Sequence, residues 1–177
     1  MNRQPFLDTA LGARYSGKMG SLPVRVLLDN VRSMYNVGAF FRTVDSAGAE
    51  GLLLCGITPR PPKPGISKTA LGAEEHVGWE FDWDAPAAAA GLAARGYEIA
   101  VVETSSGAVD LFDWRPRFPV CVVFGHEVDG TQPALLEMAS VRVRIPMLGM
   151  KHSLNVATAG GVVLYELLRK WRETVSC

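Results

Sequence analysis

An asparagine and an arginine in the segment LDNVRSMYNVGAFFRTVDSAG (28–48) are the first residues whose types and spacing suit chemistry. Asn36, Gly38 and Arg42 form an N-x-G-x-x-x-R pattern, in which Asn36 is suited to cap a helix that starts at Val37. A guanidinium on that helix can stabilise a developing oxyanion or bind a phosphate. The alternative is an ordinary capped helix with one surface arginine.

A second polar segment, VVFGHEVDG (122–130), follows a run of apolar residues. Gly125 allows a backbone to approach a ligand closely. Glu127, directly after a buried strand, can accept hydrogen bonds from loop amides or from a ligand hydroxyl. The alternative is a turn that carries a solvated carboxylate.

A third segment, VRIPMLGMKHSLNVATAGGVVLYELLR (143–169), passes from a strand through a loop into a helix that we expect to start near Ser153. Gly160 and Gly161 lie inside this helix, where each glycine costs about 1 kcal/mol relative to alanine. Such a cost suggests that another group approaches the helix closely. Tight packing of the helix on a sheet is the simpler reading.

The elements that position these segments alternate between short Val/Leu/Ile-rich runs and runs with helical spacing. Strands are predicted at 24–29, 51–55, 77–82, 97–102, 119–125 and 141–146, and helices at 37–48, 85–96, 132–139 and 153–172. A loop is predicted at 56–68, with a short helical turn at 68–75. This alternation predicts an α/β fold, with a mainly parallel sheet and helices on both faces. Ligands of such sheets bind beyond the carboxyl ends of the strands, where all three segments would lie.

Length and composition bound the class of protein. The chain has 177 residues, 48% hydrophobic and 20% charged, which suits one globular domain. No apolar run approaches the roughly 18 residues that span a membrane, and the N-terminus lacks the apolar core of a secretory signal. We therefore expect a cytoplasmic protein without membrane association. Neither the three cysteines nor the three histidines have ligand spacing, so no metal is expected.

Charge is unevenly distributed although the net charge is zero. Residues 1–70 carry nine Lys/Arg against four Asp/Glu, residues 71–140 three against twelve, and residues 141–177 six against two. The two terminal parts can therefore share a basic face, which is a weak indication of an RNA surface.

Taken together, NVGAFFRT, VFGHEVDG and IPMLGMKHSLNVATAGG resemble the motifs of SpoU-type (TrmH-like) RNA 2'-O-ribose methyltransferases of the SPOUT class, in the same order and at the same spacings. The resemblance extends from about Val24 to Arg172. It implies a methyltransferase domain at 24–177, with a trefoil knot in its C-terminal part. The N-terminal extension, 1–23, is too short for an added RNA-binding domain. The resemblance further implies a homodimer in which the partner chain completes each site and the C-terminal helix lies at the interface.

The same resemblance implies S-adenosylmethionine as cofactor, S-adenosylhomocysteine as product, and no metal. By matching position, the residues expected to contact the cofactor are Gly125, Ile145, Met147 and Leu154, with Glu103 as a looser match. The residues expected to act on the ribose 2'-hydroxyl are Asn36, Arg42, Glu127, Ser153 and Asn155.

The role of Arg42 has two interpretations. The family is often described as using this arginine as a general base, yet an arginine pKa above about 12 keeps the side chain protonated. We favour an electrostatic role, in which Arg42 stabilises the forming alkoxide and binds the adjacent phosphate. Glu127 would orient the loops, and pairing with Arg42 is one option for it.

The substrate implied is RNA, and we favour a transfer RNA over a ribosomal RNA. Besides Arg42, we expect Arg60, Lys63 and Lys68 of the loop 58–75 to bind phosphates without reading sequence. A structured surface loop without this role is the alternative. The dimer surface, the N-terminal extension or an accessory RNA-binding protein can also determine substrate choice.

Three other functions stay open at this point. One is a catalytically silent RNA-binding or cofactor-binding module of the same fold. Another is a dinucleotide-binding enzyme, which needs a G-x-G-x-x-G turn after the first strand, whereas LDNVRSMYNVG has a single glycine. The third is methylation of a base instead of a ribose.

Overall fold

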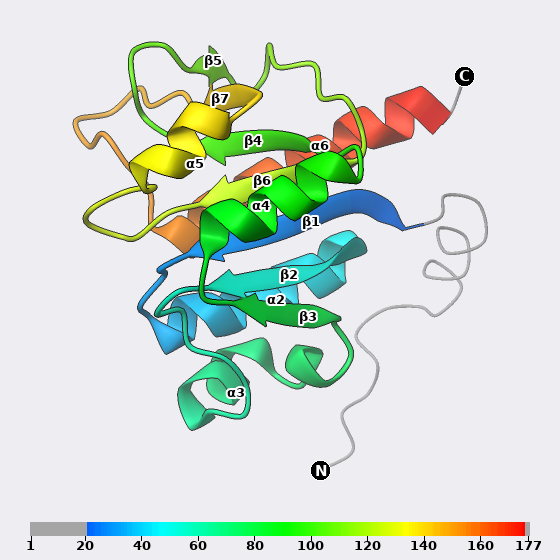
Figure 1. Ribbon diagram of the computed structural model, residues 1–177, viewed down its shortest axis with the longest axis vertical. Helices are drawn as coiled ribbons and strands as arrows, with labels where there is room; N and C mark the ends of the chain where they lie inside the picture. Colours follow the sequence, from blue (N-terminus) through cyan, green and yellow to red (C-terminus); the bar gives the residue numbers. More distant parts are fainter. Residues whose placement is uncertain (1–20, 176–177) are drawn as a thin grey trace.

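The computed structural model describes residues 21–175 and shows a parallel sheet between two layers of helices (Figure 1). The sheet order is β3-β2-β1-β6-β4-β7-β5, and every pairing is parallel. Its strands are β1 (Leu22–Asp29), β2 (Ala49–Cys55), β3 (Trp79–Asp82), β4 (Glu98–Val102), β5 (Val109–Asp110), β6 (Val120–Phe124) and β7 (Val141–Arg144). The α/β fold predicted from the sequence is confirmed. Only β5 was not predicted, because a strand of two residues has no recognisable period.

Helices cover both faces of the sheet because its strands are apolar on both sides. The helices are α2 (Met34–Ala47), α3 (Pro64–Ala70), α4 (Ala85–Ala94), α5 (Pro133–Met138) and α6 (Val156–Val175), with a 3₁₀ turn η1 (Ala73–Glu75). Val24, Val26 and Leu28 pack in one core with α2 and α6, whereas Leu27 packs in the other with α4 and α5. Alternate residues of a strand point to opposite faces, which explains the nearly continuous apolar run in β1.

The start of α2 differs from the prediction. The helix begins at Met34, and Ser33 is its cap, since Ser33 Oγ accepts a hydrogen bond from Asn36 N at 3.3 Å. The prediction that Asn36 caps a helix starting at Val37 is therefore wrong. The correction places Asn36 within the first turn, where its side-chain amide is free to bind other loops.

The start of α6 also differs. The helix begins at Val156, three residues after the predicted Ser153. Asn155 is the cap, because its Oδ1 accepts hydrogen bonds from Ala157 N at 3.0 Å and Thr158 N at 3.3 Å. Ser153 therefore lies on the preceding loop, not on the helix.

The predicted loop 56–68 is partly helical, which is a third correction. α3 begins at Pro64, whose fixed φ suits the first position of a helix and whose missing N–H is no loss there. α3 packs closely on α2 at Gly38, where an added Cβ would lie 2.1 Å from Thr69 Oγ1 and 2.3 Å from Ile66 O. The backbone of α3 thus requires a glycine at this point of α2.

The strand order places the topological switch point of the sheet between β1 and β6. From β1 the chain continues to β2 and β3 on one side, whereas β6, β4 and β7 lie on the other. After β1 the chain enters α2 behind the sheet, and after β6 it leads to α5 in front of it (Figure 1). Loops that leave neighbouring strands toward opposite faces open a ligand site at the carboxyl ends.

The two cysteines in the described part of the chain are not reactive groups. Cys55 and Cys121 are buried free thiols, and burial raises the pKa of each to about 12, so neither is a reactive thiolate. Cys177 and most of the extension 1–23 lie outside the described residues. In the range 21–175 we find no helix with the length and apolar character that crossing a bilayer requires.

Two adjacent glycines of α6 give a stability prediction. A Cβ on Gly160 would lie 2.3 Å from the ring of Phe40, whereas a Cβ on Gly161 meets nothing within 4 Å. We expect Gly160→Ala to lower the free energy of unfolding by about 1–3 kcal/mol through overpacking. Gly161→Ala should raise it by up to about 1 kcal/mol, because alanine favours the helix. Urea unfolding followed by circular dichroism measures both, and equal shifts in one direction would contradict the packing described here.

Candidate active site

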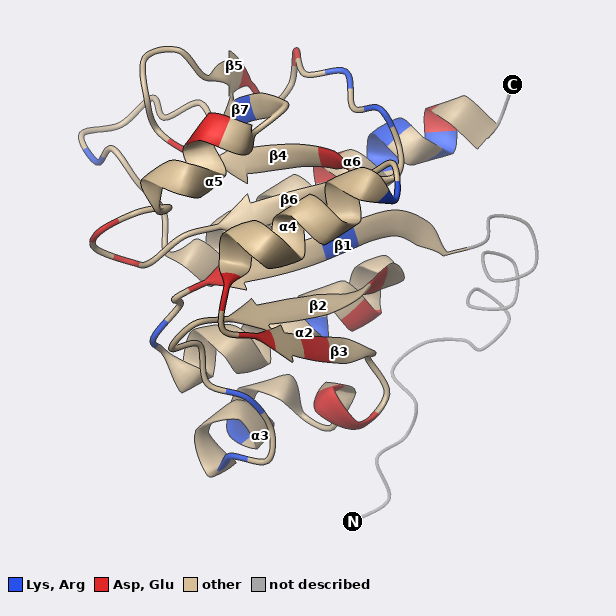
Figure 2. Cartoon of the chain, in the orientation of Figure 1, with Lys and Arg blue, Asp and Glu red and all other residues tan. Residues whose placement is uncertain are grey.

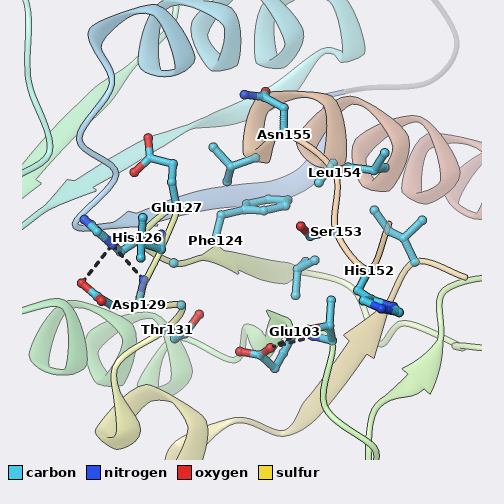
Figure 3. Close-up of a pocket in the computed structure, with 18 of the residues that line it drawn as sticks. Glu103, Phe124, His126, Glu127, Asp129, Thr131, His152, Ser153, Leu154 and Asn155 are labelled. Carbon is cyan, nitrogen blue, oxygen red and sulfur yellow. Dashed lines mark hydrogen bonds and ion pairs between the residues drawn. The ribbon is translucent and has the colours of Figure 1, made fainter. Parts of the chain in front are cut away.

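A cavity of about 540 Å³ lies at the carboxyl ends of β4, β6 and β7 (Figure 3). Its walls come from the segments that follow these strands and from the start of α6. It brings together eight residues that the sequence predicted for the site, namely Glu103, Gly125, Glu127, Ile145, Met147, Ser153, Leu154 and Asn155.

The lining of the cavity combines apolar side chains with carboxylates. Phe124 is buried beneath it, and the acidic side chains on its walls are Glu103, Glu127 and Asp129. None of the described residues that line it is a lysine or an arginine. Such a lining suits a ligand with an apolar body and a positive charge, and it does not suit a phosphate. Within residues 21–175 no group of three or more His, Cys, Asp or Glu is placed to hold a metal ion.

The carboxylate of Glu127 joins the loop after β6 to the loop after β1. Its Oε2 accepts a hydrogen bond from Arg32 N at 3.0 Å, and its Oε1 accepts one from Ser33 N at 3.1 Å. Oε1 also accepts from Asn36 Nδ2 at 3.0 Å. The partner of Glu127 is therefore Asn36, and the option of pairing with Arg42 is not what the structure shows.

Asn36 passes the connection on to α6. Its Oδ1 accepts a hydrogen bond from Asn155 Nδ2 at 3.1 Å, while Asn155 Oδ1 caps α6. Each amide uses its nitrogen and its oxygen on different partners, which fixes the orientation of both side chains. A continuous line of hydrogen bonds thus runs from Glu127 through Asn36 to the N-terminus of α6.

The electrostatics of Glu127 follow from these contacts. Partial burial acts to raise the pKa of Glu127, but hydrogen bonds from Arg32 N, the Asn36 side chain and Ser33 N outweigh it. The net effect holds the pKa below its usual value. The carboxylate is consequently a stable anion that orders loops and a weak acceptor of protons.

Asp29 makes a second tie between the same two strands, which sequence analysis missed. This buried carboxylate at the end of β1 accepts hydrogen bonds from Gln132 N at 3.0 Å and Gln132 Nε2 at 2.7 Å. It also accepts one from Asn30 Nδ2 at 2.7 Å. The sequence does contain an indication of this contact, because an aspartate ends an apolar strand. A buried carboxylate needs hydrogen-bond donors as partners.

The loop after β6 is a tight hairpin. His126 and Gly130 exchange two backbone hydrogen bonds of 3.0 Å. An added Cβ on Gly125 would lie 2.3 Å from Thr131 N and 2.4 Å from Gly130 C. A side chain at position 125 would therefore push the two arms of the hairpin apart.

The ring of His126 stabilises the same hairpin from within. Its Nδ1 accepts hydrogen bonds from Val128 N at 3.2 Å and Asp129 N at 3.0 Å. Asp129 Oδ2 also lies 3.1 Å from Nδ1 (Figure 3). The ring of His126 is thus held against the turn of the hairpin by backbone and side-chain contacts.

The basic residues predicted for the site do not line the cavity. Arg42 is exposed on α2, and within residues 21–175 its guanidinium has no hydrogen bond or ion pair. Arg60, Lys63 and Lys68 are exposed on the segment that leads into α3 and on α3 itself. Figure 2 shows the basic residues near α3 well separated from those in the second half of α6.

Comparison with known proteins agrees with this geometry. The model of the SpoU rRNA Methylase family matches residues 23–165. The chain belongs to this family. The match includes the first two polar segments, the third as far as residue 165, and the elements from β1 to the middle of α6. Membership confirms the family that the motifs indicated.

Individual members of the SpoU family extend the comparison. The tRNA (guanosine(18)-2'-O)-methyltransferase of Thermus thermophilus is 32% identical over 145 residues, which are 82% of this chain and 74% of the relative. The structure of the A. aeolicus TrmH/SpoU tRNA modifying enzyme has a TM-score of 0.80 and 26% identity, covering 93% of this chain and 86% of that one. The SpoU methyltransferase AviRb from Streptomyces viridochromogenes, solved in complex with the cofactor AdoMet, has a TM-score of 0.76 and 26% identity. That match covers 82% of this chain and 57% of AviRb.

The low pKa of Glu127 predicts a pH-dependent contribution to stability. An anion with a lowered pKa stabilises the fold above the unfolded value of about 4.3, and this stabilisation is lost as pH falls through the folded value. We expect Glu127→Gln to lower the free energy of unfolding at pH 7, and we expect the difference from wild type to shrink below about pH 4.

Urea titrations between pH 7 and pH 3 measure this difference. Glu137→Gln, which changes an exposed carboxylate on α5, is the matched control. A difference between wild type and Glu127→Gln that stays constant over this pH range would show that the anion does not hold the loops.

Proposed function

We propose that this chain transfers a methyl group from S-adenosylmethionine to a ribose 2'-hydroxyl of RNA, with transfer RNA favoured over ribosomal RNA. The observation that carries the proposal is the cavity, which the motifs after β6 and β7 line and which the motif after β1 supports through Asn36. The names of the Thermus and A. aeolicus proteins support a tRNA substrate, and the name of the family supports RNA methylation in general.

The cavity fits the chemistry of the cofactor. The apolar side chains of Ile145, Met147 and Leu154 suit the adenosine, and the carboxylates suit the positively charged sulfonium and amino groups. Oε1 of Glu103 accepts a hydrogen bond from Thr104 N at 2.7 Å, while the side chain lies on the cavity wall (Figure 3). At Gly125 the two arms of the hairpin approach each other closely, and the hairpin forms this wall of the cavity.

The protein's own residues have to align the hydroxyl and stabilise its charge. S-adenosylmethionine supplies an activated methyl group on a sulfonium. Ser153 and Asn155 lie on the cavity wall, and we assign them, with Asn36, to positioning the ribose or the cofactor. Alignment of this kind contributes several kcal/mol to catalysis. Glu127 orders the loops through its hydrogen bonds. Its lowered pKa makes it a poor base, so we do not assign it to proton abstraction.

Arg42 would stabilise the alkoxide electrostatically from a second copy of the chain. The arginine side chain is a cation, so it stabilises the developing negative charge of the 2'-oxygen and binds a neighbouring phosphate. The proton of the 2'-hydroxyl leaves to solvent water as the methyl group passes from the sulfur to the oxygen. Its position outside the cavity of its own chain supports a homodimer with composite sites. Leu148 and Met150, fully exposed beside the cavity, and Tyr165 on α6 are apolar surface that a second copy would cover.

Other consequences of the sequence analysis stay predictions. They are the trefoil knot, the domain boundary after the extension 1–23, the cytoplasmic location, the absence of a metal, and an accessory RNA-binding protein. A catalytically silent module is the main competing function. It would bind the cofactor or RNA and form no product.

Loss of Arg42 should abolish the reaction and leave cofactor binding intact. Incubation with S-adenosylmethionine and undermodified tRNA, digestion to nucleosides and mass spectrometry should show a 2'-O-methylnucleoside with wild type and none with Arg42→Ala. Arg42→Lys should retain part of the activity, because it keeps the charge but loses the bidentate geometry. A methylated base would contradict the ribose assignment, and cofactor binding without any product would favour the silent module.

Mixed dimers test the composite site in the same assay. Gly125→Ala should lose cofactor binding, because its Cβ meets backbone atoms that cannot move independently. We expect Arg42→Ala and Gly125→Ala, each inactive alone, to regain activity when refolded together. Gly107→Ala, where a Cβ meets nothing within 4 Å, is the control. A mixture that stays inactive while mixed dimers form would show that Arg42 acts within its own chain.

A further inference from the structure

An exposed tryptophan and a cluster of cations lie at the same edge of the sheet as the cavity, beside β3. We propose that an unpaired base of the RNA substrate stacks on Trp83 while its neighbouring phosphates bind the cations near α3. This inference rests on the proposed function, since it names the substrate as a single-stranded region of RNA. We call Arg60, Phe81 and Trp83 the stacking platform.

Contacts among the three residues of the stacking platform hold the indole of Trp83 in place. Trp83 follows directly after β3, and its ring meets that of Phe81 edge-on, with centroids 4.9 Å apart and an angle of 86°. The guanidinium of Arg60 lies 3.9 Å from the centroid of Phe81 and 5.8 Å from that of Trp83. These contacts orient the indole, yet it remains 73% exposed.

Of the four tryptophans, all of which lie within residues 21–175, Trp83 alone is exposed. Tryptophan is highly buried on average, and a ring left in water contributes little to the core. An ordered, exposed aromatic ring beside an arginine is what proteins use to bind unpaired bases, because every base has a face that can stack. The platform therefore has the features of a binding surface, with the ring already in position.

The other cations of this region, Lys63 and Lys68, belong to α3 and its start. Lys63 lies at the start of α3, and the ammonium of Lys68 lies 5.8 Å from the centroid of Tyr35, which is itself 53% exposed. Figure 2 shows the basic residues on α3 and the segment before it, and the acidic residues along β3. Phosphates would therefore follow α3, where lysines attract them.

The acidic neighbours of Trp83 have local partners. Asp82 Oδ1 accepts a hydrogen bond from Asp84 N at 2.9 Å, and Asp84 Oδ1 accepts one from Ala87 N at 2.9 Å as the cap of α4. Their charges repel phosphates from the immediate surroundings of the indole and do not oppose a neutral base. Trp83 is thus suited to the base, and α3 to the backbone of the same strand.

The position of the platform relative to the cavity suits one continuous RNA strand. β3 is three strands away from β6, which is about 14 Å at roughly 4.8 Å per strand. Both lie at the carboxyl edge of a parallel sheet. Nucleotides close to the methylated ribose can therefore reach Trp83. Stacking requires a base that is not already stacked in a duplex, so the platform selects a loop or another unpaired region.

The test is the affinity of the full chain for a fluorescein-labelled single-stranded oligoribonucleotide, measured by anisotropy. We expect Trp83→Ala to weaken binding about fivefold or more, and Trp83→Phe to retain most of the affinity. Lys68→Ala should reduce the salt dependence of binding. Phe112→Ala, which removes another exposed aromatic ring far from α3, is the matched control and should bind like wild type.

Kinetics and mass give independent readouts. With tRNA, Trp83→Ala should raise KM for the RNA and leave kcat and KM for S-adenosylmethionine unchanged. Equal oligonucleotide affinity for wild type and Trp83→Ala would overturn the inference, as would a smaller mass of Trp83→Ala by light scattering, which would assign the ring to an interface between copies. The oligonucleotide titration needs no methyl transfer, so it decides on the platform even if the wild type forms no product and the proposed function fails.

Discussion

The carboxylate of Glu127 is the point on which the candidate active site depends. It accepts hydrogen bonds from the amides of Arg32 and Ser33 and from the side chain of Asn36, which in turn binds Asn155 at the start of α6. Glu127 and Asn155 are exposed, so the coupling does not depend on burial but on one carboxylate and two amide side chains that each bond more than one segment. The segments after β1 and β6 and the start of α6 are consequently coupled, and displacement of one breaks its hydrogen bonds to the others.

The order of the strands in the sheet brings the segments bonded by Glu127 close together. The chain leaves β1 and β6 toward opposite faces of the sheet, and Glu127 connects the segments that follow these two strands, beside the cavity at the ends of β4, β6 and β7. Close approach of the chain at Gly125 and of Phe40 at Gly160 brings the hairpin and α6 near enough for the hydrogen bonds to form. Gly125 and Gly160 thus allow the close packing that brings the walls of the cavity together.

The fold is predictable from the sequence because strands buried on both faces are continuous apolar runs, as in β1 and β6. The starts of α2 and α6 are harder to predict. At α2, Ser33 and Asn36 are both good caps, and only tertiary contacts decide between them. At α6 the same holds for Ser153 and Asn155. The partner of Glu127 lies 91 residues away, and local charge rules favour an arginine over an asparagine. The site residues followed from the family resemblance, whereas the exposure of Trp83 depends on packing that no spacing reveals.

The central claim is that the cavity beside Glu127 holds the cofactor, and hydrogen–deuterium exchange with and without S-adenosylhomocysteine tests it most directly. We expect slower exchange in segments 102–104, 125–131 and 145–155, which line the cavity. Protection that appears instead around 112–118 and the end of α6, where a second cavity of about 440 Å³ lies, would contradict the account.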